Sequence, residues 1–554
     1  MSTHEHRCRI LGGALGNCVH VAGVFEYLRI AEQLGCDTCF LGAAVAPDLF
    51  ARAILEFDPD VICVSYRLNP SSLDTLLERL FVVLDSMPEG RARRYYFGGT
   101  PECIAVARRF NRFEVYFQGE ERPEKILESI PGIAPRQKLM RHSLAGSVGP
   151  GTRRDLLEQS FTPMIRHHFG LPSLEETIDG VACIAESEQV DVISLAPDQN
   201  AQEFFFEPWR MDPMLDGGGG VPLRSEDDLR AIWSAAQTGN FPRLKIYAGT
   251  NNLLKWAELS VRVLHVPWGT VPLFWYSLLD GRSRRPLEDA IRENSDVIRW
   301  YAQQGIPVEI NDAHQWSLRE CSDVMAVTDS YIAAYNAKRL GASTYIAQFM
   351  FNTPRLTTGR MDLAKMLASI ELMSELEDDG FTVLRQIRAG LTHFSVDMDV
   401  AKGQLAASTL LGLAIRPHIV HVVGFCEADH PARPEDVIES CKIVRGVLKN
   451  GLRHFPDMTQ DEDVQARKNH LIEQARVFLS TIRQVYSEFE DPLCDSRCLS
   501  SLVTSGFLDA PHLQGNPCAL GRVKTMPIRG AYETVDARGA VISENERLKV
   551  LLDH

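Results

Sequence analysis

A histidine, a serine and a glycine pair stand at the turns that follow the first apolar segments of the chain. His20 lies within the segment Cys18-Val19-His20-Val21-Ala22-Gly23, Ser65 ends a second apolar run, and Gly98-Gly99 end a third. Open parallel sheets bind ligands at the carboxyl ends of their strands, where these residues would lie. Glycine lets the backbone approach a bulky ligand because it has no Cβ. The pattern predicts a site for a large cofactor near the start of the chain.

The elements that must position these residues alternate between strand-like and helix-like patterns. Residues 9–13, 61–65 and 95–99 are short apolar runs, and residues 21–33 have the spacing of an amphipathic helix. This alternation predicts a doubly wound, Rossmann-like parallel sheet over residues 1–135. Proline and glycine then interrupt both periodicities, which predicts a linker at residues 136–150.

After the linker, apolar runs and longer helical patterns alternate repeatedly. This repetition predicts a (β/α)8 barrel of the TIM type over residues 151–489. The expected strands are 190–195, 244–248, 263–266, 308–310, 344–351 and 418–423, and the expected helices are 295–304, 322–340, 363–376, 436–448 and 464–489. Residues 490–554 are rich in Gly and Pro and are expected to be a mostly irregular tail packed on the barrel.

The composition favours an enzyme of small molecules over a protein that binds nucleic acid or a membrane. The 554 residues are 45% hydrophobic and 24% charged, and the formal net charge of −15 repels phosphate groups. The 13 cysteines are scattered and are expected to be reduced thiols. Because no apolar run of membrane-spanning length and no secretory signal is evident, we expect a cytoplasmic protein.

Motifs in the barrel and the tail resemble those of a known enzyme family. They are residues 506–511 (Gly-Phe-Leu-Asp-Ala-Pro), Asn516, Gly521, Met526-Pro527, Arg529, residues 394–397, Ala401, Gly403 and Gly249-Thr250. They resemble the catalytic subunit of glutamate mutase (methylaspartate mutase), and the N-terminal module resembles the small corrinoid-binding subunit of that enzyme. The resemblance implies that both subunits are fused in one adenosylcobalamin-dependent radical mutase, which is expected to form a homodimer.

The resemblance places the N-terminal residues against a corrinoid of the vitamin B12 type. His20 matches the lower axial ligand of the cobalt, a role that suits an imidazole nitrogen. Cys18 replaces a family aspartate that hydrogen-bonds this histidine, and a thiol is a weaker acceptor; Asn17 is an alternative orienting group. Arg67 replaces a leucine and either reaches a corrin carboxamide or faces solvent. The other cofactor-binding candidates are Val19, Gly23, Ser65, Leu68, Gly98, Gly99, Thr100 and Gly119.

In the barrel, the resemblance implies an adenosine site and a changed substrate site. Glu427 matches a glutamate that binds the ribose hydroxyls, although the neighbouring lysine of the family is Val423 here. His168, Ala201 and Tyr247 stand where the family has three arginines that clasp the carboxylates of glutamate. Because those arginines are replaced, a small substrate other than glutamate is expected. The catalytic candidates are Glu427, Tyr247 and His168, and His314 and His393 are further candidates for polar substrate contacts.

Three other segments leave alternatives open. The aromatic run within residues 265–276 either shapes a substrate pocket or belongs to the core. The four glycines 217–220 cradle a phosphate of the corrinoid tail, serve as a mobile lid, or form a plain flexible loop. The arginines within residues 282–285 either hold an anionic substrate group or face solvent.

Two other functions are compatible with the N-terminal module. One is a methylcobalamin-dependent methyltransferase, and the other is a corrinoid-binding protein without catalytic activity. The tail motif and Glu427 favour the mutase, because a methyltransferase needs no adenosine pocket.

Overall fold

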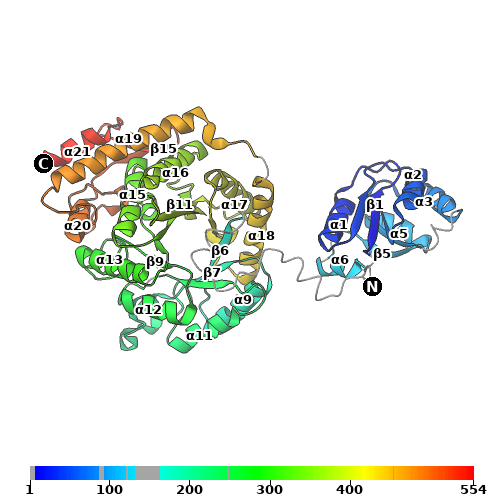
Figure 1. Ribbon diagram of the computed structural model, residues 1–554, viewed down its shortest axis with the longest axis horizontal. Helices are drawn as coiled ribbons and strands as arrows, with labels where there is room; N and C mark the ends of the chain where they lie inside the picture. Colours follow the sequence, from blue (N-terminus) through cyan, green and yellow to red (C-terminus); the bar gives the residue numbers. More distant parts are fainter. Residues whose placement is uncertain are drawn as a thin grey trace. The chain divides into compact units, whose positions relative to one another are not determined.

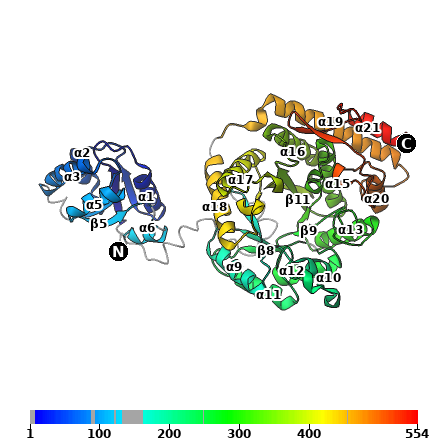
Figure 2. The same cartoon turned by 180° about the vertical axis from the view of Figure 1, so that it is seen from behind.

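The computed structural model describes residues 7–86, 93–119, 121, 123–131, 162–247, 249–452 and 455–553. The chain divides into two compact units, unit 1 (residues 1–146) and unit 2 (residues 147–554), which Figure 1 and the reverse view in Figure 2 show. The predicted linker at residues 136–150 lies outside the described residues. In the part of the chain that is described, none of the helices combines the length and apolar character needed to cross a bilayer.

Unit 1 is built on a parallel sheet of five strands in the order β2-β1-β3-β4-β5. The strands are β1 (Arg9–Ala14), β2 (Asp37–Phe40), β3 (Val61–Tyr66), β4 (Arg94–Gly99) and β5 (Phe113–Phe117). Every residue of β3 is buried, as expected for a parallel strand covered on both faces. The strand order reverses between β1 and β3, which opens a crevice at the carboxyl edge of the sheet.

Helices cover both faces of this sheet. Apolar residues of α1 (Ala22–Gln33) and α6 (Pro123–Ser129) pack on one face. Those of α2 (Pro47–Phe57), α3 (Pro70–Asp85) and α5 (Pro101–Arg109) pack on the other face. The last three helices begin with proline, which has no N–H to leave unsatisfied in the first turn.

Unit 2 contains eight parallel strands that form a nearly closed barrel (Figure 1). Their order is β8-β7-β6-β13-β12-β11-β10-β9, so the first barrel strand pairs with the last. No ladder joins β8 to β9 within the described residues. The strands are β6 (Met164–Phe169), β7 (Val192–Leu195), β8 (Arg243–Ile246), β9 (Gly269–Val271), β10 (Val308–Ile310), β11 (Thr344–Phe351), β12 (Thr382–Ala389) and β13 (Ile419–Val422).

At least one helix follows each barrel strand, and together the helices surround the barrel (Figure 2). They are α9 (Leu174–Glu186), α10 (Gln199–Phe204), α11 (Glu226–Ala235), α12 (Leu253–Leu264), α13 (Leu287–Gln303), α14 (Ala313–Ser317), α15 (Asp323–Arg339), α16 (Gly359–Ser374), α17 (Met398–Gly412) and α18 (Pro434–Gly451). The predicted mixed α/β architecture with a parallel barrel is confirmed.

The strand predicted at residues 263–266 is wrong. Val263 and Leu264 end helix α12, whose buried face also includes Trp256, Ala257 and Ser260. These residues recur at the three- and four-residue spacing of a helix, and Val263 completes that stripe. His265 then ends the helix in a left-handed conformation, and the next strand, β9, begins at Gly269.

The tail is also more regular than predicted. Helix α19 (Glu462–Val485) is followed by α20 (Ser496–Thr504), an antiparallel hairpin of β14 (Thr525–Ile528) and β15 (Ala531–Thr534), and α21 (Glu544–Leu552). Asp509 explains part of the tail motif, because its buried carboxylate accepts hydrogen bonds from the backbone N–H groups of Gly521, Arg522 and Val523. These bonds fix the loop between α20 and the hairpin.

Candidate functional site

Unit 1 contains a cavity of about 210 Å³ on the face of the sheet that α1 and α6 cover. Residues of α1, of the carboxyl halves of β3 and β4, and of the segment after β5 line it. Tyr27, Tyr96 and Phe117 supply aromatic surface, and their rings contact one another. The predicted cofactor residues Gly23, Ser65, Arg67, Gly98, Gly99 and Gly119 all belong to the lining.

The glycines of this lining serve two different purposes. A Cβ added at Gly23, Gly98 or Gly119 would meet nothing within 4 Å, so each borders open space. A Cβ at Gly99 would lie 2.4 Å from the backbone oxygen of Tyr66, so that glycine permits close packing of β4 against β3. The first three glycines therefore leave space in the cavity, whereas Gly99 allows β3 and β4 to lie close together.

His20 lies on the exposed loop between β1 and α1. Its Nδ1 atom is 3.7 Å from the Sγ atom of the buried Cys18, and the hydroxyl of Ser65 donates to the backbone oxygen of His20 at 3.4 Å. Within the described residues, no hydrogen bond is found to Nε2 of His20. The ring is therefore held weakly on one side and offers its other nitrogen to a ligand.

The remaining cofactor-binding candidates lie in this loop or near it, and within the described residues none of them hydrogen-bonds to the His20 side chain. The Asn17 side chain accepts a hydrogen bond from Tyr66 at 3.2 Å, so it is oriented by Tyr66. Val19 is exposed, the backbone oxygen of Leu68 accepts from the Cys103 thiol, and Thr100 caps helix α5. Leu68 and Thr100 have structural roles at the carboxyl edge of the sheet.

The barrel interior of unit 2 consists of three layers along the strands. Nearest the amino ends of the strands is an apolar layer of Met164, Val192, Trp268, Ile346, Leu384 and Ile419. Successive inward positions lie two residues apart on a strand. The middle layer, one step further, consists of Arg166, Ser194, Lys245, Glu309, Gln348, Gln386 and His421, all of them buried. The mouth layer, another step toward the carboxyl ends, contains His168, Tyr247 and Arg388.

Glu309 organises the middle layer. Its carboxylate accepts hydrogen bonds from Arg166 at 2.8 and 3.1 Å and from the Trp268 indole at 2.6 Å, and Lys245 Nζ lies 3.3 Å away without a well-aligned hydrogen bond. Burial alone would raise the pKa of Glu309, but Arg166 and Lys245 outweigh it and hold this pKa well below its usual range. Burial, and then the charge of Arg166, lower the pKa of Lys245 to about 7.

In the mouth layer, His168 and Tyr247 form a hydrogen-bonded, stacked pair. The Tyr247 hydroxyl accepts from Arg166 at 3.2 Å and lies 2.7 Å from Nε2 of His168, and the two rings stack at 4.8 Å. Burial, followed by the charges of Arg166 and Arg388, lowers the pKa of His168 well below its usual value, so the ring is neutral. A neutral ring that accepts at Nε2 carries its proton on Nδ1. This pair is an oriented donor at the barrel mouth.

Arg388 is a cation without a partner in the mouth layer. Its Nε atom is buried, and no hydrogen bond or ion pair to its guanidinium is found within the described residues. Burial and the charge of Arg166 lower the pKa of Arg388, and the charges of Glu427 and Glu309 partly oppose that shift. Glu427, in the turn after β13, is exposed; desolvation of its carboxyl raises its pKa, and the charge of Arg388 opposes that shift.

The other predicted substrate contacts are arranged differently. His314 is buried, its Nδ1 atom lies 3.1 Å from the Gln348 amide nitrogen, and burial lowers its pKa to about 3. His393 lies in a short 3-10 helix outside the barrel layers. Ala201 is buried in α10. The structure therefore brings His168, Tyr247 and His314 into the barrel interior.

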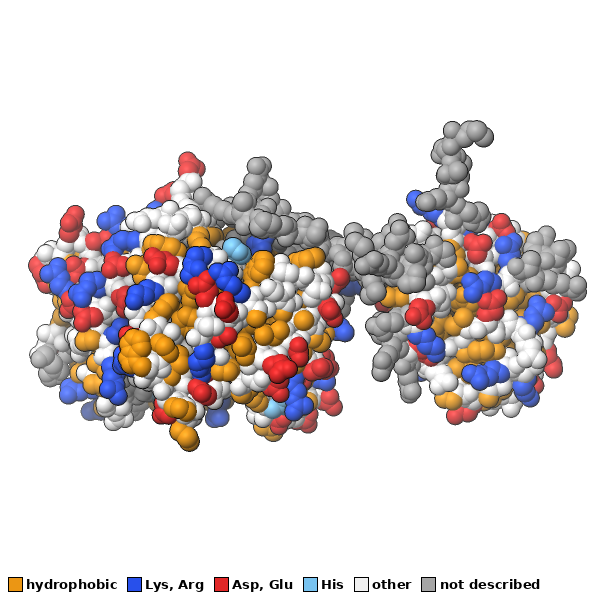
Figure 3. Space-filling view, turned by 90° about the horizontal axis from the view of Figure 1, so that it is seen from below, with side chains coloured by type: hydrophobic (Ala, Val, Ile, Leu, Met, Phe, Trp, Pro, Cys, Tyr) orange, Lys and Arg blue, Asp and Glu red, His pale blue; other side chains and the backbone are white. Residues whose placement is uncertain are grey.

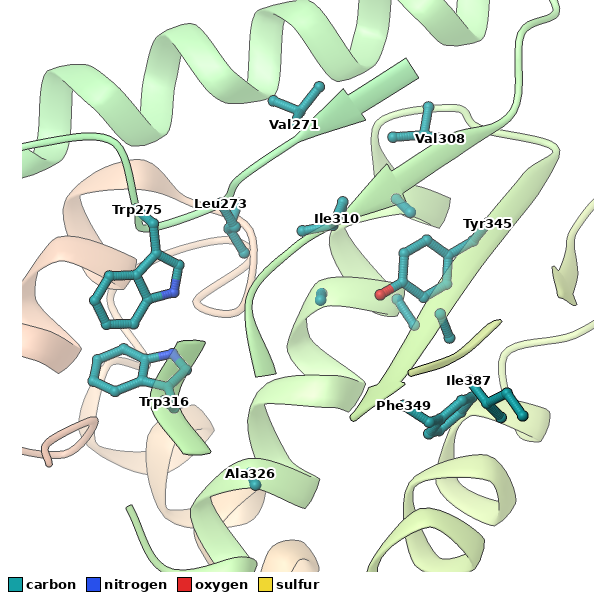
Figure 4. Close-up of a cluster of buried hydrophobic side chains, with 14 of the residues drawn as sticks. Val271, Leu273, Trp275, Val308, Ile310, Trp316, Ala326, Tyr345, Phe349 and Ile387 are labelled. Carbon is teal, nitrogen blue, oxygen red and sulfur yellow. The ribbon is translucent and has the colours of Figure 1, made fainter. Parts of the chain in front are cut away.

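The aromatic run within residues 265–276 belongs mainly to the core. Trp275 packs against Trp316 with ring centroids 4.8 Å apart, and Leu273 lies near Trp275 in the same buried cluster (Figure 4). Trp268 and Phe274 are also fully buried, whereas His265 is exposed. The run stabilises the barrel wall.

The glycine loop and the arginine cluster are held by their own neighbours. The N–H of Gly217 donates to Asp198, which also binds Arg224, and Gly220 packs against the backbone of Ala196. Arg285 pairs with Glu293, and Arg282 lies over the ring of Tyr276.

The sequence analysis missed Arg166 and Arg388. We expected no arginine at the substrate site because the three family arginines are replaced by His168, Ala201 and Tyr247. Arginines on other strands were not taken into account. Arg388 lies on β12, a strand that was not predicted, and Arg166 on β6, also not predicted. Residues 386–389 (Gln-Ile-Arg-Ala) alternate between polar and apolar, as in a half-polar strand, but this pattern is too short to predict a strand by itself.

Comparisons with known proteins add no family assignment. No protein-family model matches the chain, and no curated protein matches it. Among solved structures, the crystal structure of NtrX from Brucella abortus aligns with 79% of this chain and 100% of its own at 11% identity. The TM-score of 0.17 is too low to indicate a shared fold.

Proposed function

We propose that the chain is an adenosylcobalamin-dependent radical carbon-skeleton mutase that acts on a small substrate other than glutamate. In this proposal unit 1 is a Rossmann-like cobalamin-binding domain, and the TIM-type barrel is the catalytic domain. One observation carries it: a glycine-lined cavity at the carboxyl edge of the sheet adjoins a loop whose exposed histidine has an available ring nitrogen. The order of motifs that resembles glutamate mutase supports the choice among corrinoid enzymes.

The residues of unit 1 fit a corrinoid. His20 would bind the cobalt through Nε2, while Cys18 faces Nδ1 at 3.7 Å. The nucleotide tail of a corrinoid ends in a flat aromatic base. The cavity has aromatic walls, and three glycines leave its interior free for such a group. Ser65 lines this cavity and fixes the backbone of His20, so it links the tail site to the cobalt ligand.

When bound, adenosylcobalamin supplies a carbon-centred radical that can take a hydrogen atom from the substrate. The barrel residues would bind and orient the substrate and exclude water from it. The carboxyl ends of barrel strands are the usual place for such sites, and the mouth layer lies there. His168 would donate from Nδ1, because Tyr247 occupies its Nε2. Glu427 would accept hydrogen bonds from the adenosine ribose.

The test is to titrate the full chain with adenosylcobalamin and, separately, with methylcobalamin. Absorption spectra report binding, and nitrogen hyperfine splitting in the electron paramagnetic resonance spectrum of the cobalt(II) form reports a nitrogen ligand. Labelling histidine with ¹⁵N should change that splitting in the parent chain, and His20→Ala should abolish the change. His470→Ala, an exposed histidine of α19, is the matched control. If the splitting changes neither with the ¹⁵N label nor in His20→Ala, His20 is not the axial ligand of the cobalt.

A second variant pair tests the cavity. Gly98→Ala places a methyl group in open space and should weaken cofactor binding without changing the stability of unit 1. Gly99→Ala should instead destabilise the sheet, because its methyl group would clash with the Tyr66 carbonyl. Unaltered cobalamin affinity in Gly98→Ala would exclude this cavity as the tail site.

Activity assays distinguish the mutase from the methyltransferase and from the corrinoid-binding protein without catalytic activity. A mutase should give a cobalt(II)–radical pair with adenosylcobalamin and a substrate from a panel of small carboxylic and amino acids. Methyl transfer from methylcobalamin without such a pair would identify a methyltransferase. Binding without either reaction would identify a corrinoid carrier.

A further inference from the structure

We infer that Arg388 binds a single carboxylate of the substrate at the barrel mouth, so that the substrate is a monocarboxylic acid whose other end is uncharged. This inference deepens the proposed function, because it treats the barrel as the catalytic unit. It does not require cobalamin to be bound. The geometry that supports it is the distribution of charged partners inside the barrel.

Every other interior cation of the barrel has a partner from the fold itself. Arg166 pairs with Glu309 and also donates to Ser194 and Gln386, and Lys245 lies 3.3 Å from Glu309. Glu309 is the carboxylate that both cations share. Within the described residues, no ion pair or hydrogen bond joins Arg388 to Glu309 or to Glu427, so the charges of these carboxylates act on it only at longer range.

A buried polar donor without a partner is costly, and proteins rarely keep one for stability. The Nε atom of Arg388 is such a donor, while the side chain as a whole is half-buried and so remains accessible to a ligand. Arginine carries its donors in a planar fork that matches the two oxygens of a carboxylate. The position of Arg388 suits such a ligand, because it is one inward step beyond Gln386, toward the carboxyl end of β12. The fold therefore supplies half of an ion pair at the place where barrel ligands bind.

A second donor faces the same layer. His168 carries its free proton on Nδ1, and Arg388 lies close enough for its charge to affect the pKa of His168. An arginine and a neutral imidazole N–H together satisfy one carboxylate.

The number of unpaired cations in the mouth layer limits the substrate to one carboxylate. A second substrate carboxylate would need a second free cation, and the described mouth layer offers none besides Arg388. Arg319 stacks on Trp275 and donates to Gln315, and Arg285 pairs with Glu293. In the glutamate mutase family, which the sequence resembles, three arginines hold a substrate with two carboxylates. This barrel holds its unpaired arginine on a different strand.

The test measures ligand binding to the full chain without cobalamin. The probes are butanoate, its neutral isostere butanamide, and the dicarboxylate pentanedioate, at constant ionic strength and at up to tens of millimolar. Isothermal calorimetry gives the affinity, and thermal unfolding gives an independent measure because a ligand stabilises the state that binds it. Butanoate should bind at least about ten-fold more tightly than butanamide, which corresponds to one charge-assisted hydrogen bond. Pentanedioate should bind less tightly than butanoate.

Arg388→Gln should remove the preference for butanoate, and Arg388→Lys should keep part of it. Arg385→Gln is the matched control, because Arg385 lies on the same strand and donates to the backbone oxygen of Arg416 outside the barrel interior. Equal binding of acid and amide, no binding of butanoate, tighter binding of pentanedioate, or an unchanged preference in Arg388→Gln would each overturn the inference. Since cobalamin is absent, these outcomes are independent of the spectra that test His20.

Discussion

The middle layer and the mouth layer of the barrel use arginine in opposite ways. Arg166 in the middle layer has a carboxylate, a hydroxyl and an amide from three other strands, β10, β7 and β12, as partners. Arg388 lies two residues beyond Gln386 on β12 and has none of these. An arginine that the fold neutralises stabilises the barrel, whereas one that the fold leaves unpaired is available to a ligand. The two layers therefore separate the structural part of the barrel from the part that we assign to function.

The largest effect is expected where the middle layer loses its carboxylate. Glu309→Gln leaves Arg166 and Lys245 buried without a countercharge, so the free energy of unfolding should fall by about 3 kcal/mol or more. Urea unfolding followed by tryptophan fluorescence measures this change, because Trp268 is buried beside Glu309.

Glu226→Gln is the matched control for that measurement. Glu226 pairs with Arg230 and Arg262 on the protein surface, where solvent and salt screen the pair. Its loss should change the free energy of unfolding far less. Equal losses in both variants would show that the middle layer is no more important than a surface ion pair.

The second effect is a pH dependence that Lys245 imposes on the middle layer. Burial and the charge of Arg166 hold the pKa of Lys245 at about 7 in the folded protein, below the usual value of 10.5 for lysine. A lowered folded-state pKa contributes stability that is present above the unfolded value and is lost as the pH falls through the folded value. The parent chain should therefore lose stability between about pH 10 and pH 7, with a slope of at most about 1.4 kcal/mol per pH unit from this group.

Lys245→Met removes that titration. The difference in unfolding free energy between Lys245→Met and the parent chain should shift in favour of the variant as the pH falls from about 10 to 7. Lys255→Met, at an exposed position of α12, should give a difference that does not depend on pH. Parallel pH profiles for the parent chain and Lys245→Met would contradict the expected shift.

The sequence predicted best two buried strands in which apolar residues outnumber polar ones, although Glu309 and Gln348 on these strands face the polar middle layer. Strand β10 has the predicted bounds 308–310, and β11 has the predicted bounds 344–351, with every residue buried. In unit 1, the turn residues Ser65 and Gly98 were placed correctly at strand ends, because strand ends and glycines coincide there. Hydrophobic periodicity is a reliable signal where both faces of a strand are covered by apolar side chains.

The same signal failed where the barrel interior is polar. Strands β6 and β12 bring Arg166, His168, Gln386 and Arg388 inward, so their sequences lack the continuous apolar run of a buried parallel strand. The partners of these residues come from strands far apart in the sequence. Only the closed arrangement of the barrel shows which arginine is neutralised and which is not.

The surface shows no contrast like that between the paired Arg166 and the unpaired Arg388. On the face shown in Figure 3, Lys and Arg side chains are interspersed with Asp and Glu and with hydrophobic side chains. Some charged pairs on the surface, such as Arg292 with Asp289, join neighbouring turns of one helix, and others, such as Arg262 with Glu226, join different helices. An unpaired charge is therefore informative inside the barrel, where solvent does not screen it.

The smallest change in stability is expected from the residue that we assign to the ligand. Arg388→Gln removes a half-buried cation whose buried Nε atom has no partner within the described residues, so the free energy of unfolding should stay unchanged or rise by about 1 kcal/mol. Arg166→Gln, which removes the paired arginine two strands away, should lower it by about 3 kcal/mol because Glu309 loses its main partner. Urea unfolding of both variants under one set of conditions measures the contrast. A loss in Arg388→Gln as large as that in Arg166→Gln would mean that Arg388 supports the fold, and the distinction between the two layers would then be lost.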